Sequence, residues 1–201
     1  MAFFTPHHEV LAARVLRPAR ATPIALVWVA QVVGFALLTA LFAQIRITLP
    51  FTPVPITGQT FAVLLSGAAL GMWAGGASQF LYIVLGVFFP FYAGGTSGTE
   101  VLFGATGGYL FGFVIAAALV GKLAERHHDR RVISAVTAFL TGSLIIYVFG
   151  VIGLMAAAAT QFDLVTALEK GVVPFVVGDV IKAYAAGLLL PAAWRLTNRD
   201  T

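Results

Sequence analysis

An acidic and a basic residue lie three positions apart within an otherwise apolar stretch near the carboxyl end of the sequence. Asp179 and Lys182 fall inside the apolar residues 172–194, and Gly178 precedes the aspartate. Residues three apart share one face of a helix, so the two side chains can form an ion pair. Ionisable groups at membrane depth are costly and typically mark a functional site, with a purely structural pair as the alternative. Gly178 favours a ligand site, because it leaves room beside the carboxylate.

Two loops rich in proline or glycine supply further groups that can contact a ligand. The first loop ends in Gln59, whose amide can donate and accept hydrogen bonds from the start of a helix. The second loop, at residues 89–98, and the helices beside it contribute Tyr82, Phe91, Tyr92, Gly94, Gly95 and Tyr109. Aromatic rings form apolar walls, and glycines let a backbone approach a ligand closely. The alternatives are a rigid connecting loop and, for Gly107, Gly108 and Gly112, close packing of helices.

The other polar residues argue against several kinds of catalytic site. The sequence contains no cysteine, which excludes thiolate nucleophiles and cysteine zinc sites. The four histidines, His7, His8, His127 and His128, fall in regions expected on the opposite side of a membrane from Asp179. A Ser-His-Asp set or a histidine metal site is therefore not expected. The sequence also lacks the Gly-Lys-Ser/Thr of a phosphate-binding loop, so we expect neither a metal nor a cofactor.

The composition indicates that membrane helices position these groups. The 201 residues are 60% hydrophobic and only 10% charged, whereas ordinary globular domains carry about 25% charged residues. So few charges cannot cover a protein of this size in water, which argues against a soluble enzyme and for an all-α integral membrane protein. The six predicted transmembrane segments cover residues 24–45, 59–73, 76–90, 104–121, 132–159 and 172–194. The second and third are short, so we expect them to lie against protein, beside a cavity.

The basic residues predict how these segments are oriented. Nine of the twelve Lys and Arg residues precede the first segment, lie between the fourth and fifth, or follow the sixth. The positive-inside rule places these regions, with both termini, in the cytoplasm, so the net charge of +4 requires no nucleic-acid partner. We expect a poorly helical cytoplasmic tail over residues 1–22, a six-helix domain in the lipid bilayer over residues 23–195, and a cytoplasmic tail over residues 196–201.

A stripe of small residues follows one face of the first segment. Ala36 and Ala40 are four positions apart and Ala43 lies beyond them, so this face can approach another helix closely. We expect the stripe to contact a partner helix, with internal packing as the alternative.

Four motifs resemble those of the BioY family in order and spacing. They are Pro53-Val54-Pro55-Ile56-Thr57-Gly58-Gln59, residues 82–86 leading to Ala93-Gly94-Gly95, Gly104-Ala105-Thr106-Gly107-Gly108-Tyr109, and Gly178-Asp179-Val180-Ile181-Lys182. The resemblance covers residues 24–195. The sequence departs from the family pattern at Ala105, where the family has proline, and at Phe91 and Tyr92, where it has valine and phenylalanine.

The resemblance implies a biotin-binding S component of an energy-coupling-factor (ECF) transporter. Such a protein is a six-helix bundle that captures biotin at the outer face for uptake. A transmembrane T component, the implied partner of the alanine stripe, and two ATP-binding subunits would energise it, since this sequence has no nucleotide-binding motif. Asp179 can then accept from a ureido N–H of biotin, Lys182 can donate to the ureido carbonyl or to the carboxylate, and Gln59 can do both.

Two other functions stay open at this point. One is an S component for another small vitamin, because one fold serves several substrates and only the site differs. The other is an intramembrane enzyme, which would need a denser set of carboxylates or histidines than a single Asp–Lys pair.

Overall fold

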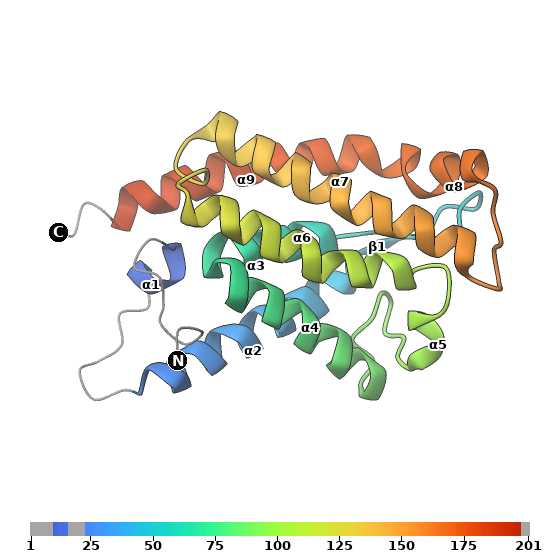
Figure 1. The fold of residues 1–201 in the computed structure, drawn as a ribbon, viewed down its shortest axis with the longest axis horizontal. Coiled ribbons are helices and arrows are strands. Elements are labelled where there is room, and N and C mark those ends of the chain that lie inside the picture. Colours follow the sequence, from blue (N-terminus) through green and yellow to red (C-terminus); the bar gives the residue numbers. More distant parts are fainter. Residues whose placement is uncertain (1–9, 16–22, 198–201) are drawn as a thin grey trace.

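The computed structural model describes residues 10–15 and 23–197 of the chain. Figure 1 shows these residues as a bundle of helices with one short hairpin among them. In chain order the elements are α1 (Leu11–Val15), α2 (Ile24–Ala43), β1 (Arg46–Ile47), β2 (Ile56–Thr57), α3 (Gln59–Leu70), α4 (Met72–Phe88), α5 (Thr99–Leu102), α6 (Gly107–Glu125), α7 (Val132–Ala156), α8 (Leu164–Gly171) and α9 (Val173–Thr197). The two strands pair antiparallel, with Arg46 opposite Thr57 and Ile47 opposite Ile56.

Six of the helices match the six apolar stretches of the sequence, which confirms that prediction. α2, α6, α7 and α9 are long and apolar enough to cross a membrane, whereas α3 and α4 have 12 and 17 residues. At about 1.5 Å per residue, α3 covers roughly 18 Å of a hydrocarbon layer about 30 Å thick. It packs against α2, α4 and α6, and most of its side chains are buried. Protein therefore surrounds this short helix, as its length requires.

The turn between α3 and α4 is fixed by a glycine and a carboxylate. Gly71 has a φ of +82°, a conformation that glycine adopts without strain. The Oε1 atom of Glu125, at the end of α6, accepts a hydrogen bond of 2.9 Å from the Met72 N–H at the start of α4. The hairpin of the two short helices is thereby anchored to α6.

The region near the N-terminus contains a helix that the sequence did not predict. Residues 11–15 form α1, which packs against α3 and α9, and Ala12 is 7% exposed. The expectation of a poorly helical tail is wrong for these residues, because tertiary packing stabilises a helix too short to form alone. The rest of that expected tail, residues 1–9 and 16–22, lies outside the described residues. At the other end, α9 continues to Thr197, two residues beyond the expected end of the membrane domain.

The connection between α6 and α7 is anchored by a buried carboxylate. Asp129 is 2% exposed, and its Oδ2 atom accepts a hydrogen bond from the indole N–H of Trp194 on α9. The guanidinium of Arg130 lies 4.5 Å from the centre of the Trp194 ring. Burial raises the pKa of the Asp129 carboxyl above its usual range.

The alanine stripe on α2 faces the inside of the chain. Ala36, Ala40 and Ala43 are 1%, 6% and 0% exposed, and α2 packs against α3 and α4. Small side chains here let the helices approach closely, as the spacing predicts. Because the chain itself covers the stripe, the expectation that these alanines contact a partner helix is wrong, and internal packing describes the structure.

Ala40→Trp is expected to lower the thermal unfolding temperature of the protein in detergent. An indole at a position that is 6% exposed has to push neighbouring helices apart, and overpacking typically costs about 1–3 kcal/mol. The matched control is Leu41→Trp, because Leu41 is the next residue of the same helix and is 64% exposed. Equal unfolding temperatures for the two variants would show that the stripe is not tightly packed.

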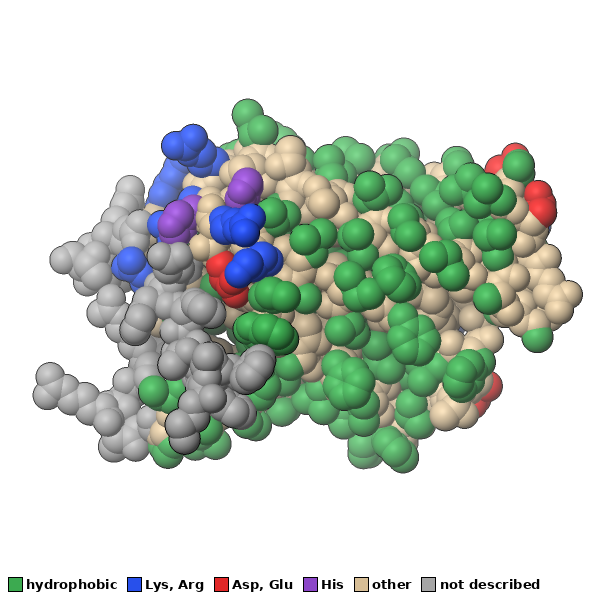
Figure 2. All heavy atoms as spheres, viewed as in Figure 1, with side chains coloured by type: hydrophobic (Ala, Val, Ile, Leu, Met, Phe, Trp, Pro, Cys, Tyr) green, Lys and Arg blue, Asp and Glu red, His purple; other side chains and the backbone are tan. Residues whose placement is uncertain are grey.

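Exposed apolar side chains form a belt around the bundle. Leu41, Phe80 and Ile181, on three different helices, are 64%, 61% and 64% exposed. In Figure 2 hydrophobic side chains cover most of the visible middle of the molecule, and charged side chains lie toward the two ends. A soluble protein does not expose apolar surface on this scale, so the belt is the face that contacts lipid. The chain is an integral membrane protein.

The basic side chains gather at one end of the bundle. Figure 1 shows α1, the start of α2, the α6–α7 connection and the end of α9 together at this end, with α5 and α8 at the other. Figure 2 shows lysine, arginine and histidine side chains concentrated there. Lys122, Arg126 and Arg131 are all exposed in this region. Both ends of the six-helix domain therefore lie on the same side, as an even number of spans requires.

Candidate functional site

A pocket opens among α3, α6, α7 and α9, toward the end of the bundle that holds α5 and α8. Its volume is 590 Å³, including the part open to solvent. Residues of the β1–β2 connection and of the α4–α5 loop complete its rim. The lining side chains that carry polar atoms are Thr57, Gln59, Thr60, Tyr92, Thr106, Tyr109, Tyr147, Asp179 and Lys182.

Asp179 is the centre of the polar wall of this pocket. Its side chain is 4% exposed, and its Oδ1 atom accepts hydrogen bonds from the Thr60 hydroxyl at 3.0 Å and from the Lys182 ammonium at 2.8 Å. Its Oδ2 atom accepts one from the Tyr147 hydroxyl at 2.6 Å. Side chains from α3, α7 and α9 thus converge on one carboxylate. Since each carboxylate oxygen has about two lone pairs, one acceptor position on Oδ2 remains for a ligand N–H.

The ammonium group of Lys182 is fully occupied by protein acceptors. Its Nζ atom donates to the Thr57 carbonyl oxygen at 2.9 Å, to the Thr60 hydroxyl at 2.7 Å and to Asp179 Oδ1 at 2.8 Å. An ammonium has three donors, so none is left over. Lys182 therefore ties α9 to the start of α3 and fixes the carboxylate. What this cluster presents to the pocket is hydrogen-bond acceptors.

Gln59 connects the pocket to a second row of polar contacts behind it. Its Oε1 atom accepts from the Thr57 hydroxyl at 2.8 Å, and its Nε2 atom donates to the Tyr82 hydroxyl at 2.7 Å. Tyr82 is fully buried on α4 and donates in turn to the Phe91 carbonyl oxygen at 3.2 Å. The two partners hold the Gln59 amide in one orientation, and one N–H of that amide remains for a ligand acceptor.

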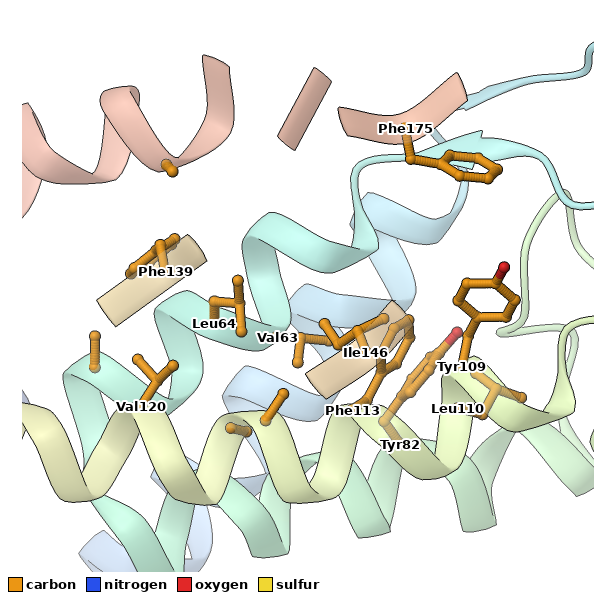
Figure 3. Packing of buried hydrophobic residues seen from close by; sticks show 14 of the residues in the cluster. Val63, Leu64, Tyr82, Tyr109, Leu110, Phe113, Val120, Phe139, Ile146 and Phe175 are labelled. Carbon is orange, nitrogen blue, oxygen red and sulfur yellow. The ribbon is translucent and has the colours of Figure 1, made fainter. Parts of the chain in front are cut away.

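Aromatic and aliphatic side chains form the apolar walls. The Tyr109 hydroxyl donates to the Gly171 carbonyl oxygen at 2.7 Å, which holds its ring beside Phe175 with the ring centres 6.5 Å apart. Figure 3 shows Tyr109 and Phe113 on α6, with Ile146 on α7 and Phe175 on α9. All four line the pocket. They supply the flat, dry surface that a small apolar ring requires.

The structure brings together half of the residues that the sequence suggests for ligand contact. The predicted residues that line the pocket are Gln59, Tyr92, Tyr109, Asp179 and Lys182. Those that do not line it are Tyr82, Phe91, Gly94, Gly95 and Gly178. Of these, Tyr82 supports Gln59 from behind, and the Phe91 ring stacks on Phe89 with the ring centres 5.5 Å apart.

None of the three predicted glycines lines the pocket. A Cβ at Gly178 would meet nothing within 4 Å, so there is open space at this glycine, but the space is not part of the pocket lining. Gly94 and Gly95 have φ angles of +72° and +75° and form a tight turn after Tyr92. A Cβ at Gly94 would overlap the guanidinium of Arg46, so this glycine accommodates that side chain.

Sequence reasoning missed two of the three groups that donate to Asp179. Thr60 directly follows Gln59 in the first turn of α3, where a second polar side chain in a buried helix was a usable signal. Tyr147 lies in the middle of the 25-residue apolar helix α7, and nothing in the local sequence distinguishes it from a lipid-facing tyrosine. Within residues 10–15 and 23–197, no group of three His, Asp or Glu side chains is placed to hold a metal ion.

The sequence of this chain is similar to that of known proteins. The model of the BioY family matches residues 14–199. The biotin transporter BioY of Rhizobium etli is 34% identical in an alignment of 168 positions, which covers 76% of this chain and 88% of that protein. The biotin transporter BioY of Thermotoga maritima is 39% identical over 144 residues, which are 71% of this chain and 82% of that protein.

A solved structure has the same fold. The crystal structure of the S-component for biotin from an ECF-type ABC transporter matches 88% of this chain and 95% of its own, with a TM-score of 0.77 and 22% identity. The expected S-component-like bundle of six transmembrane helices is thereby confirmed. Since the family model covers nearly the whole chain and the relatives match it over most of their length, the chain belongs to the BioY family.

Proposed function

We propose that this chain is the membrane component that captures biotin for uptake. The observation that carries the proposal is the Asp179 wall, where a buried carboxylate with one free acceptor position faces an apolar pocket. Biotin carries a ureido group with two N–H donors and one carbonyl acceptor, an apolar thioether ring, and a carboxylate on an aliphatic tail. Family membership and relatives named as biotin transporters support the same ligand.

The pocket offers a partner for each part of the ureido ring system. Asp179 Oδ2 and the Tyr147 oxygen can accept the ureido N–H groups, and the free N–H of Gln59 can donate to the ureido carbonyl. Tyr109, Phe113 and other apolar side chains can enclose the thioether ring. This division between a polar wall and apolar walls gives the ligand one preferred orientation.

The proposal includes partner subunits that supply the energy for transport. A transmembrane T component and two ATP-binding subunits are the partners of an ECF module, and the structural neighbour is a component of an ECF-type ABC transporter. The sequence has no nucleotide-binding motif, which supports ATP hydrolysis by other chains. The chain itself then acts without a cofactor, as a binding protein and not as an enzyme.

Binding of radiolabelled biotin to the purified chain in detergent tests this function. We expect one saturable site per chain, displaced by unlabelled biotin and not by riboflavin or thiamine, with the bound label recovered as unaltered biotin. Displacement by another vitamin would instead support the alternative S component. A modified product would support an intramembrane enzyme, and absence of binding would refute the proposal.

We also propose a cell-membrane location with the basic end in the cytoplasm. The support is the concentration of exposed lysine and arginine side chains at the end that holds α1 and the α6–α7 connection. The pocket then lies near the outer face.

Reporter fusions are expected to place both termini of the chain in the cytoplasm. Alkaline phosphatase should be inactive when fused at either terminus or inserted between α6 and α7, and active when inserted between α7 and α8. Green fluorescent protein should give the reverse pattern. Phosphatase activity at a single terminus would contradict the six-span topology, and activity at both termini would invert the orientation.

A further inference from the structure

A second cavity adjoins the pocket on the side of the β1–β2 hairpin. We call it the vestibule; its volume is 740 Å³, including the part open to solvent. The vestibule and the main pocket share four lining residues, Pro55, Ala93, Val101 and Thr106. The two cavities are therefore adjacent, and only these four residues need to give way for a ligand seated against Asp179 to reach the vestibule.

Arg46 gives the vestibule a positive charge. It is the one charged side chain among the described residues that line this cavity. Strand β1 carries it, and its Nη1 atom donates to the Ala93 carbonyl oxygen at 3.4 Å. Gly94 leaves the space in which the guanidinium lies. A guanidinium has five N–H donors, so most of them remain available to an anion.

The main pocket, in contrast, is poorly suited to an anionic group. All three donors of Lys182 are taken by protein acceptors, and the carboxylate of Asp179 beside it is already negative. A ligand carboxylate at this wall would meet lone pairs on Asp179, Thr60 and Tyr147. A planar guanidinium with free donors is the better partner for a carboxylate.

We propose that Arg46 binds the carboxylate of the ligand in the vestibule and so sets its orientation in the site. The inference rests on the proposed capture of biotin and extends it. The ureido ring lies against Asp179, and the aliphatic tail runs past Pro55 and Ala93 to the guanidinium. Arg46 is then the residue that selects a ligand with an anionic tail, and Lys182 is a positioning residue for Asp179.

Binding of biotin and of its neutral tail amide to the same variants tests the assignment. Wild-type protein is expected to bind biotin about tenfold more tightly than biotin amide, since hydrogen bonds to charged groups are the stronger ones. Arg46→Gln should lose this preference by binding biotin more weakly, with unchanged affinity for the amide. Arg46→Lys should restore part of the preference. The control Lys170→Gln removes another cation at this end of the bundle, held 4.9 Å above the Phe162 ring, and should keep the full preference.

The amide also reports whether each variant is folded, because it lacks the negative charge for which Arg46 is proposed to select. Equal preference for biotin in wild type and Arg46→Gln would overturn the role of Arg46 and leave biotin capture intact. Loss of the preference in Lys182→Met, with amide binding retained, would place the carboxylate at Lys182 and also overturn it. If wild-type protein binds neither compound, biotin capture itself fails and the role of Arg46 with it.

Discussion

Asp179→Asn is expected to weaken biotin binding at least about tenfold while the protein stays folded. Three protein donors already converge on this side chain, from Thr60, Tyr147 and Lys182. Asparagine has one side-chain oxygen, which can still accept from some of these protein donors. Its amide nitrogen replaces the other carboxylate oxygen, and this N–H donor then faces the ureido N–H of biotin. Losing a hydrogen bond inside a dry pocket costs about 1–3 kcal/mol, and more for a charged group.

A double variant separates this role from that of a structural ion pair. Suppose that Asp179 and Lys182 only neutralise each other. The double variant Asp179→Asn with Lys182→Met should then destabilise the protein less than Lys182→Met alone, because the single variant leaves an uncompensated buried charge. If the carboxylate holds the ligand, the double variant should bind biotin as poorly as Asp179→Asn.

Isothermal titration with biotin and thermal unfolding without ligand are the two measurements needed. Glu169→Gln is the matched control, because it removes an exposed carboxylate at the same end of the bundle. Near-normal biotin affinity in well-folded Asp179→Asn and Lys182→Met proteins would move the site elsewhere in the chain.

Gly108→Ala is expected to lower the free energy of unfolding by about 3 kcal/mol, near the upper end of typical overpacking costs. A Cβ at this position of α6 would overlap the Phe149 carbonyl oxygen and lie 2.8 Å from the Gly153 Cα on α7. Both are backbone atoms, so the two helices have to separate. The close-packing alternative for this glycine is thus the one that the structure shows.

The control for this variant is the same substitution in open space. A Cβ at Gly34, inside α2, would meet nothing within 4 Å. Gly34→Ala should be neutral or stabilising by up to about 1 kcal/mol, because alanine is the better helix former. Chemical or thermal unfolding in one detergent compares the two, and equal stability of both variants would contradict the backbone contact between α6 and α7.

The long elements of the fold were predictable, and most of the short ones were not. Uninterrupted apolar stretches locate the six large helices within a few residues, because a membrane helix must be apolar along its whole length. α5 and α8 have 4 and 8 residues, and each strand has two. The strands and α5 are too short to leave a periodic pattern, and α1 was missed for the same reason. α8, in contrast, is amphipathic, and its pattern was a usable signal.

The sequence predicts those site residues that are strongly polar within an apolar stretch, and it does not predict the others. Asp179, Lys182 and Gln59 are polar residues in or beside apolar stretches, so their residue types alone indicate a functional site. Tyr147 takes part only because α7 brings its hydroxyl to Asp179 from 32 residues away, a relation that no local pattern records. Arg46 has no local sequence feature that distinguishes it from an ordinary loop cation, and only the fold shows that it lines a cavity next to the pocket.

A crystal structure of the protein with biotin bound is the most direct test that the Asp179 pocket is the biotin site. We expect a ureido nitrogen within about 2.7–3.2 Å of Asp179 Oδ2, with the ring system against Tyr109 and Phe113. Biotin bound outside this pocket, or bound inside it with no contact to Asp179, would contradict the assignment.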